Sequence, residues 1–276
     1  MRLTMIILLA FWSVSLWAKG NNVRILTLDA QDIKTLKATC GAGFLKVEGK
    51  PDLQQIRVTA EIRPQGMHPQ KLKELIVLQL KRKGDSAVLI SKTKNSNRNL
   101  LDWLLGTGSG DIEINVTVEL PQKMNLQIVD GSGSTDIRNI IGHADINDGS
   151  GYLTIQNVQG PLQISDGSGG MLVGNINGTC RINDGSGEMT LKDMSGEVQI
   201  TDGSGSIFVN TVNGTLEITD SSGDIEIRHV TQNVIIRDGS GDIRANDIGG
   251  DLVLKATGSG KVITNDIRGK IIGWRD

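Results

Sequence analysis

Apolar and polar residues alternate through most of the second half of the chain, and the alternation recurs every 18 residues. Each repeat opens on Asp-Gly-Ser-Gly or, at Asp220, on Asp-Ser-Ser-Gly; the opening residues are Asp130, Asp148, Asp166, Asp184, Asp202, Asp220 and Asp238. Counted from its Asp, a repeat is apolar at positions 6, 8, 11, 15 and 17 and mostly polar at their neighbours. Alternation with a period of two is typical of strands that bury one face. The pattern therefore predicts two short strands in each repeat.

Two turns join these strands, one at Asp-Gly-Ser-Gly and one that usually carries a Gly at position 13 of the repeat. Because the two halves of a repeat are equal in length, one repeat closes one coil. A single coil cannot bury its own apolar face, so neighbouring coils must stack, about 4.8 Å apart. The sequence thus predicts an all-β fold: a β-solenoid of the single-stranded β-helix type, with an 18-residue, two-strand coil.

The chain before the regular repeats is less ordered in its pattern. Residues 107–276 are expected to form the regular solenoid, and residues 19–106 a divergent β region that caps its N-terminal end. Within the cap, Phe44 and Leu45 open a divergent strand, and a hairpin is expected around Gly84. One helical turn is expected at Pro69–Glu74.

Residues 1–18 have the pattern of a signal peptide. Arg2 supplies the positive charge, Met5–Trp12 is almost wholly apolar, and cleavage is expected after Ala18. Cleavage after Ser15 is the alternative, because Leu16 is larger than usual for the −3 position. This apolar run is too short for a membrane span, and no later stretch of the sequence is long and apolar enough to be one. We therefore expect an exported protein, periplasmic or extracellular at the cell surface, with no transmembrane span in the mature chain.

The composition agrees with a fold of many tight turns, because the chain has 35 glycines but only three phenylalanines and one tyrosine. The formal net charge of −2 gives no basic surface for nucleic acid, so nucleic acid is not an expected partner. An oxidising compartment permits a disulfide between Cys40 and Cys180. We do not expect one, because Cys180 falls in an inward apolar column of the repeat and Cys40 lies in a turn many strands earlier.

The layout resembles the bacterial putative-adhesin family of β-strand repeat proteins. The resemblance rests on the leader, on the strand ending in Glu119-Leu120-Pro121, and on Ser-Gly turns followed by Asp-Ile, as in Gly223-Asp224-Ile225 and Gly241-Asp242-Ile243. It implies a β-repeat fold. The family has no assigned activity and offers no catalytic residues to carry over.

The aspartates that open the repeats should stack as a column of carboxylates. Adjacent charges at that spacing repel by roughly 0.9 kcal/mol in water. We expect each carboxylate to accept hydrogen bonds from the Ser and Gly amides of its own turn. The alternative is a calcium ladder between coils, with Asp130, Asp148, Asp166, Asp184, Asp202, Asp220 and Asp238 as ligands.

No catalytic or cofactor-binding residues are predicted, and an enzyme is not expected. The coils carry almost no insertions that could build a groove, and the repeat shows no aromatic row on which sugars could stack. The sequence favours an exported, non-catalytic solenoid that presents an adhesin-like binding surface to a glycan, an envelope component or a protein. The alternative is a periplasmic structural protein that self-associates, with calcium stabilisation as a variant. The segment Leu100–Leu105 is expected either to pack as a cap or to dock a partner.

Overall fold

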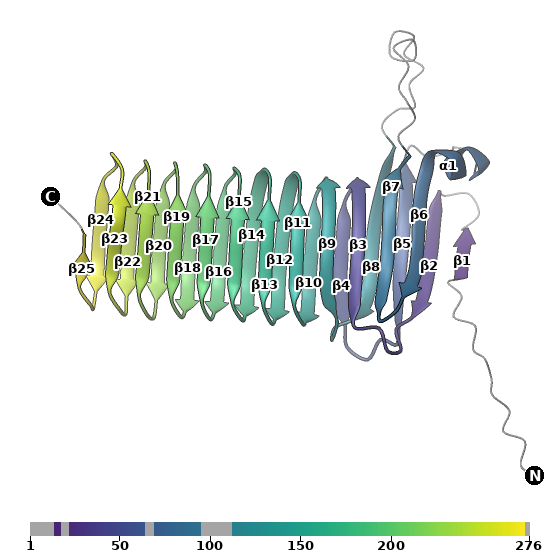
Figure 1. Ribbon diagram of the computed structural model, residues 1–276, viewed down its shortest axis with the longest axis horizontal. Helices are drawn as coiled ribbons and strands as arrows, with labels where there is room; N and C mark the ends of the chain where they lie inside the picture. Colours follow the sequence, from purple (N-terminus) through teal and green to yellow (C-terminus); the bar gives the residue numbers. More distant parts are fainter. Residues whose placement is uncertain (1–13, 18–21, 64–68, 95–111, 274–276) are drawn as a thin grey trace, which may run out of the picture.

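The computed structural model describes residues 14–17, 22–63, 69–94 and 112–273 as an elongated stack of coils (Figure 1). Its strands form two long sheets, one of 13 strands and one of 12, whose inner faces enclose a single hydrophobic core. About eight coils follow one another along the stack. The predicted all-β solenoid is therefore confirmed.

Each regular coil gives one strand to each sheet. The 12-stranded sheet receives β9 (Asn125–Ser132), β11 (Ala144–Asp148), β13 (Leu162–Asp166), β15 (Cys180–Asp184), β17 (Val198–Asp202), β19 (Leu216–Asp220), β21 (Val234–Asp238), β23 (Leu252–Thr257) and β25 (Ile271–Ile272). The 13-stranded sheet receives β10 (Thr135–Ile141), β12 (Gly151–Gln159), β14 (Gly169–Asn177), β16 (Met189–Ser195), β18 (Ile207–Asn213), β20 (Ile225–Val230), β22 (Ile243–Ile248) and β24 (Val262–Ile267).

Successive coils pair in parallel, with each residue beside its equivalent one repeat later, as Ile146 is beside Ile164. The register breaks once, between Ile236 and Arg237, where a β-bulge pairs Arg237 with Ala256. This extra residue explains why the last Ser-Gly turn, at Thr257, comes one residue late in the sequence.

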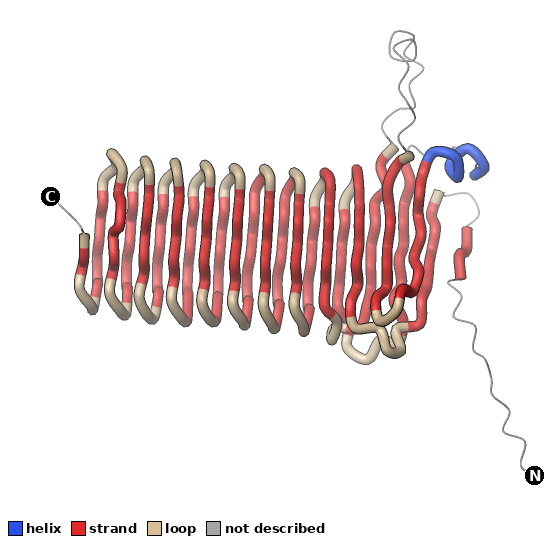
Figure 2. Tube along the Cα trace, in the orientation of Figure 1, coloured by secondary structure: helices blue, strands red, loops and turns tan. Residues whose placement is uncertain are grey.

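The N-terminal region is interleaved with the solenoid. It contains β2 (Val23–Asp29), β3 (Thr35–Ala42), β4 (Leu45–Lys50), β5 (Gln55–Arg63), the helix α1 (Pro69–Leu75), β6 (Ile76–Lys83), β7 (Ser86–Thr93) and β8 (Glu113–Pro121). The hairpin of β6 and β7, which turns at Gly84, and the short helix α1 confirm the sequence predictions. β3 lies between β7 and β9, and β4 lies between β8 and β10, so the coil of β3 and β4 is itself a layer of the parallel stack. Beyond it in the 13-stranded sheet, β5 pairs antiparallel with both β8 and β2. Figure 2 shows that strands, drawn in red, make up most of the described chain.

The coils approach one another so closely at the Ser-Gly turn that a side chain there would collide with backbone. Gly187 has φ of 145°, and a Cβ built on it would lie 1.6 Å from the carbonyl oxygen of Gly169 in the preceding coil. Glycine is therefore required at this position by both backbone conformation and space.

Several predictions fall on parts of the chain outside the described residues. These include most of the predicted signal peptide and the Leu100–Leu105 segment. Val14–Trp17 is described as the strand β1, which pairs antiparallel with β2. In the described parts of the chain, no helix has the length and hydropathy needed to cross a membrane.

Candidate functional site

The seven repeat aspartates form a buried column inside the solenoid. Register places each one beside the next, from Asp130 beside Asp148 to Asp220 beside Asp238. Their exposed fractions are only 1–7 %. The column continues past Asp130 to Cys40 and then Ser91, and at the other end it reaches Thr257. These carboxylates therefore line the interior and do not form an outer binding surface.

Four of the seven aspartates accept a hydrogen bond at one carboxylate oxygen, and Asp148, Asp166 and Asp202 accept one at neither oxygen. The amide of Ser240 donates to Asp238 Oδ1 over 3.1 Å, and Thr135 Oγ1 donates to Asp130 Oδ2 over 3.1 Å. Every aspartate of the column nevertheless keeps at least one buried carboxylate oxygen with no hydrogen-bond partner among protein atoms. The predicted amide hydrogen bonds thus account for part of the column.

Burial disfavours the charged form of these carboxyl groups. It raises the pKa of Asp166 to about 6, and the charges of Asp148 and Asp184 raise it further. The pKa values of Asp130, Asp148, Asp202 and Asp238 are likewise raised to about 6, chiefly by burial, and those of Asp184 and Asp220 are raised for the same reason. Across the described residues, no three or more His, Cys, Asp or Glu side chains cluster as a metal site. The calcium ladder stays a prediction.

A second column, exposed at the opposite turn, links the coils by side-chain hydrogen bonds. Asn157 Nδ2 donates to Asn139 Oδ1 over 2.9 Å, and Asn175 Nδ2 donates to Asn157 Oδ1 over 2.7 Å. All members of the column have left-handed backbone conformation, with φ between 53° and 66°; they are Asn139, Asn157, Asn175, Asp193, Thr211, His229, Asp247 and Asp266. Asn and Asp adopt this conformation more readily than other side chains, so the column shapes the turn.

The outer face of the 13-stranded sheet carries the aromatic side chains. Among residues with described side chains, the aromatics are Phe44, Tyr152 and Phe208, and all three lie on this face, outside the core. Phe44 and Tyr152 are 41 % and 49 % exposed, while Phe208 is half-buried under the guanidinium of Arg228, 5.6 Å from its ring centre. Sequestering aromatic side chains from the core and placing them on one outer face points to a binding surface.

Phe44 and Tyr152 share one column of this face. Leu45 and Leu153, the residues that follow them, both pair with Thr135. Phe44 and Tyr152 therefore lie on either side of Ser134, and the two aromatic residues are two coils apart. On the usual strand spacing that separation is roughly 10 Å. The sequence prediction of no aromatic row missed this pair, because it depends on β4 lying in the stack beside β10. The motif Cys40-Gly-Ala-Gly, in register with Asp130-Gly-Ser-Gly, was the signal that could have revealed it.

Tyr152 is positioned by a glycine on the neighbouring strand. A Cβ built on Gly170 would lie 2.7 Å from Cε2 of the Tyr152 ring, so the ring lies over the glycine. On the adjacent strands β12, β14, β16 and β18 the central outward column is uncharged: Thr154, Leu172, Thr190 and Phe208. We call Tyr152, Gly170 and this column the Tyr152 band.

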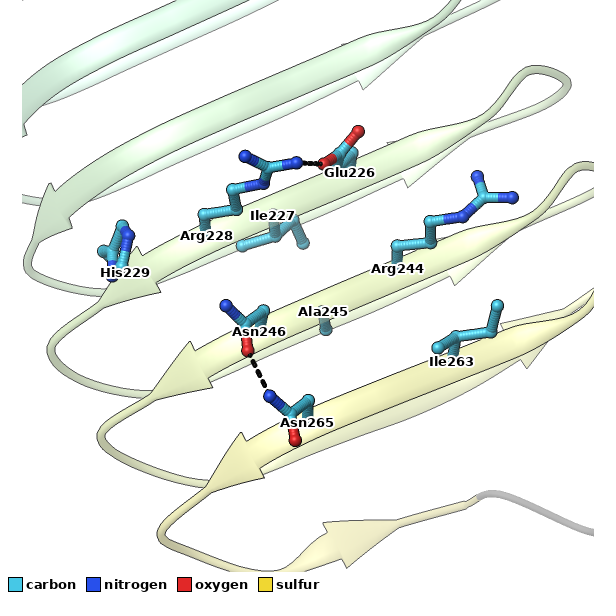
Figure 3. Close-up of a pocket in the computed structure, with 9 residues that line it drawn as sticks. All are labelled: Glu226, Ile227, Arg228, His229, Arg244, Ala245, Asn246, Ile263 and Asn265. Carbon is cyan, nitrogen blue, oxygen red and sulfur yellow. Dashed lines mark hydrogen bonds and ion pairs between the residues drawn. The ribbon is translucent and has the colours of Figure 1, made fainter.

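Charged residues border the Tyr152 band on both sides and pair among themselves. Arg138 Nε lies 2.6 Å from Asp136 Oδ1 on β10, and Arg228 pairs with Glu226 on β20. Beyond Glu226 the face is hollowed into a shallow pocket of about 390 Å³ (Figure 3). Its sides include Arg228, Arg244 and Ile263, and Asn265 Nδ2 donates to Asn246 Oδ1 across it over 2.9 Å.

His229, which lines this pocket, also lies beside a carboxylate outside the pocket lining. His229 Nδ1 lies 2.9 Å from Asp247 Oδ2, and the guanidinium of Arg268 is 3.6 Å from the other oxygen of Asp247. Arg244 pairs with Asp242 over 3.0 Å. The basic groups of this end of the sheet are thus largely held by acidic neighbours, as in an ion-pair network on a solvated surface.

Neither cysteine forms a disulfide in the structure; both are buried and free. Cys40 is on β3 and Cys180 is on β15, and β9, β11 and β13 lie between these strands in the sheet. Four strand spacings amount to roughly 19 Å, far beyond the span of a disulfide.

No protein-family model matches the chain, and a search of curated protein sequences found no relative. Solved structures do match. One from Parabacteroides merdae, named a "putative adhesin", has a TM-score of 0.54 at 16% identity, covering 91% of this chain and 96% of that chain. A "putative lipid binding protein" from Parabacteroides distasonis has a TM-score of 0.54 at 18% identity, covering 91% of this chain and 98% of that chain. A "putative adhesin" from the same species has a TM-score of 0.51 at 15% identity, again covering 91% and 98%. The resemblance read from the Ser-Gly turns is confirmed at the level of fold: the chain is a β-solenoid of the kind found in structures that bear the adhesin name.

Proposed function

We propose that this chain is an exported, non-catalytic, adhesin-like protein whose binding surface is the outer face of the 13-stranded sheet. Its partner is a cell-surface or envelope component, a glycan or a protein. The observation that carries the proposal is the outward placement of Phe44, Tyr152 and Phe208 on this one face, while the core is filled by aliphatic side chains. Exposed aromatic residues are favoured at binding surfaces because they bury large areas at low entropic cost.

The rigidity of the stack supports a binding role. Neighbouring coils are held by continuous backbone ladders and by side-chain ladders such as Asn139–Asn157–Asn175. A face built on such strands holds its side chains in fixed positions, and a partner then binds without first ordering the surface. The names of the solved neighbours, which include adhesin, agree with a binding role.

The non-catalytic part of the proposal rests on how the polar groups in and beside the pocket are paired. Glu226 pairs with Arg228, and Asp247 pairs with both His229 and Arg268. A general acid or base needs a proton that it can exchange with substrate, whereas these groups are arranged as lateral surface pairs. Both thiols are buried, so neither is placed as a nucleophile.

Protease treatment of intact cells, beside fractionation of medium and periplasm, tests where this surface acts. Digestion of the native protein from outside, or its release to the medium, agrees with an adhesin-like role at the surface. Complete protection in the periplasm restricts the partner to an envelope component, which in-cell crosslinking would capture. Retention of the protein in the cytoplasm would contradict the proposal.

A second candidate is a structural protein that self-associates through its coil ends, and the last described coil favours it. β24 and β25 each end a sheet, and the apolar side chains of Ile263, Ile271 and Ile272 around them are 38–52 % exposed. Sedimentation velocity across a concentration series separates the two candidates. A species whose mass grows with concentration, and which Ile271→Lys returns to monomer, would favour self-association.

A further inference from the structure

We propose that the Tyr152 band binds an uncharged glycan chain that runs along the solenoid axis, with a sugar ring stacked on Tyr152. The inference rests on the proposed function and names its ligand class. It draws on three observations about this face: the support of the Tyr152 ring, the spacing of the outward columns and the distribution of charge.

Gly170 holds the Tyr152 ring in a position that a ligand can reach. Because the ring lies over Gly170, one side of it is supported by the sheet, and the residue remains 49 % exposed. A supported and exposed aromatic ring is suited to stack against the apolar C–H face of a sugar. Its position is fixed by the glycine, so little conformational freedom is lost on binding.

Within each outward column, the residues of successive coils repeat at the strand spacing, about 4.8 Å. That spacing is close to the length of one pyranose unit in an extended chain, so successive sugars would meet equivalent positions of successive coils. On the same strand as Tyr152, Thr154 presents a hydroxyl group and Gln156 presents an amide, and Thr190 presents a second hydroxyl group two coils further along. These groups can both donate and accept hydrogen bonds with sugar hydroxyls.

The distribution of charge selects an uncharged chain. Glu188, which directly precedes β16, and Lys192 on β16 stand on either side of Thr190 and carry opposite charges. At the two borders of the band, Asp136 forms an ion pair with Arg138, and Glu226 forms one with Arg228. Recognition of a carboxylated or sulfated glycan would call for Arg side chains directed at the ligand, whereas the guanidinium groups at these borders are already paired.

Gly170 of the band and Gly174, which lies outside the band on the same strand, provide a matched pair of variants. In Gly170→Ala the new Cβ would occupy the space of the Tyr152 ring, which must move, while Tyr152 itself is unchanged. In Gly174→Ala the new Cβ meets only a carbonyl oxygen of Lys192 at 3.7 Å, an ordinary contact. Neither glycine has positive φ, so the backbone accepts alanine at both.

The test is a calorimetric titration of the full chain with cellohexaose and chitohexaose as neutral probes and a galacturonic acid hexamer as the acidic probe. Thermal melts establish that each variant is folded. We expect a neutral probe to bind, Tyr152→Phe and Gly174→Ala to bind within about twofold of wild type, and Gly170→Ala and Tyr152→Ala to bind at least about tenfold more weakly. Equal binding by Gly170→Ala and wild type would overturn the inference, as would binding of the acidic probe alone.

The same variants keep the inference distinct from the proposed function. If no neutral probe binds, but binding to isolated envelopes is weakened by Tyr152→Ala, the glycan inference is overturned and the binding face stands, with a protein as its partner. If envelope binding is present and unaffected by every variant of the face, the proposed function is overturned as well.

Discussion

Cys40 lies in register beside Asp130, in the place that an aspartate holds in each of the next seven coils. The thiol adds no charge to the column, so Asp130 has a charged neighbour on one side only. Register thus identifies Cys40-Gly-Ala-Gly as a divergent copy of the Asp-Gly-Ser-Gly turn, and it places the coil of β3 and β4 inside the solenoid.

The thiols should be inert in the folded protein. Burial raises the pKa of Cys40 and of Cys180 to about 12, so both are protonated at neutral pH, and only the thiolate reacts quickly. We expect no reaction with a thiol-specific chromogenic reagent at pH 8 in buffer and reaction of both thiols in denaturant. Rapid labelling of one thiol without denaturant would show that its coil opens locally.

The buried aspartates should make the protein more stable in mild acid than in mild base. Because the folded pKa of Asp166 is about 6 against an ordinary 3.8, the folded state binds more protons than the unfolded state between these values. Stability therefore rises as pH falls through 6 and levels off near 4. We expect the free energy of unfolding to be larger at pH 5 than at pH 8 by at least about 2 kcal/mol, measured by urea denaturation.

Asp166→Asn tests the same column at a single coil. The amide keeps the shape of the side chain, removes repulsion from Asp148 and Asp184, and can donate a hydrogen bond to either of them. We expect stabilisation by roughly 1 kcal/mol at pH 8 and a smaller dependence on pH. Asp32→Asn, at an exposed turn with φ of 59°, is the control and should change neither the stability at pH 8 nor its dependence on pH.

A melting temperature at pH 8 that rises with calcium and falls with a chelator would instead support the calcium ladder.

Thr211 should be a point of strain in the outer ladder. It is a β-branched residue at φ of 66°, where the equivalent residues of most other coils are Asn or Asp. We expect Thr211→Asn to raise the free energy of unfolding by about 1 kcal/mol, because asparagine tolerates this conformation. Thr201→Asn, in the regular strand β17, is the control and should bring no gain. Equal effects of the two substitutions would contradict the assignment of strain.

The regular coils could be predicted from sequence because their pattern is local. Period-two alternation fixes which residues of β11 and β12 face the core, and the 18-residue interval fixes their partners in the next coil. The bulge after Ile236 could also be anticipated from the late turn at Thr257.

The candidate site could not be predicted in the same way, since it depends on pairing between distant segments. Phe44 reaches the column of Tyr152 only because β4 pairs with β8 and β10, and β8 begins more than 60 residues after β4 ends. Repeats so far apart, and with Cys in place of Asp, leave little local signal of register. The support of Tyr152 by Gly170 likewise depends on side-chain packing across strands.

The measurement that tests the central claim most directly compares the two outer faces of the solenoid in binding to envelopes from the organism that encodes the chain. Thr154→Arg with Thr190→Arg places two bulky charges on the 13-stranded sheet, and Gln163→Arg with Thr201→Arg places two, at the same coil spacing, on the 12-stranded sheet. We predict that the first pair weakens cosedimentation by roughly tenfold or more and the second leaves it unchanged. Equal loss in both pairs, or loss only in the second, would contradict the assignment of the binding surface to the outer face of the 13-stranded sheet.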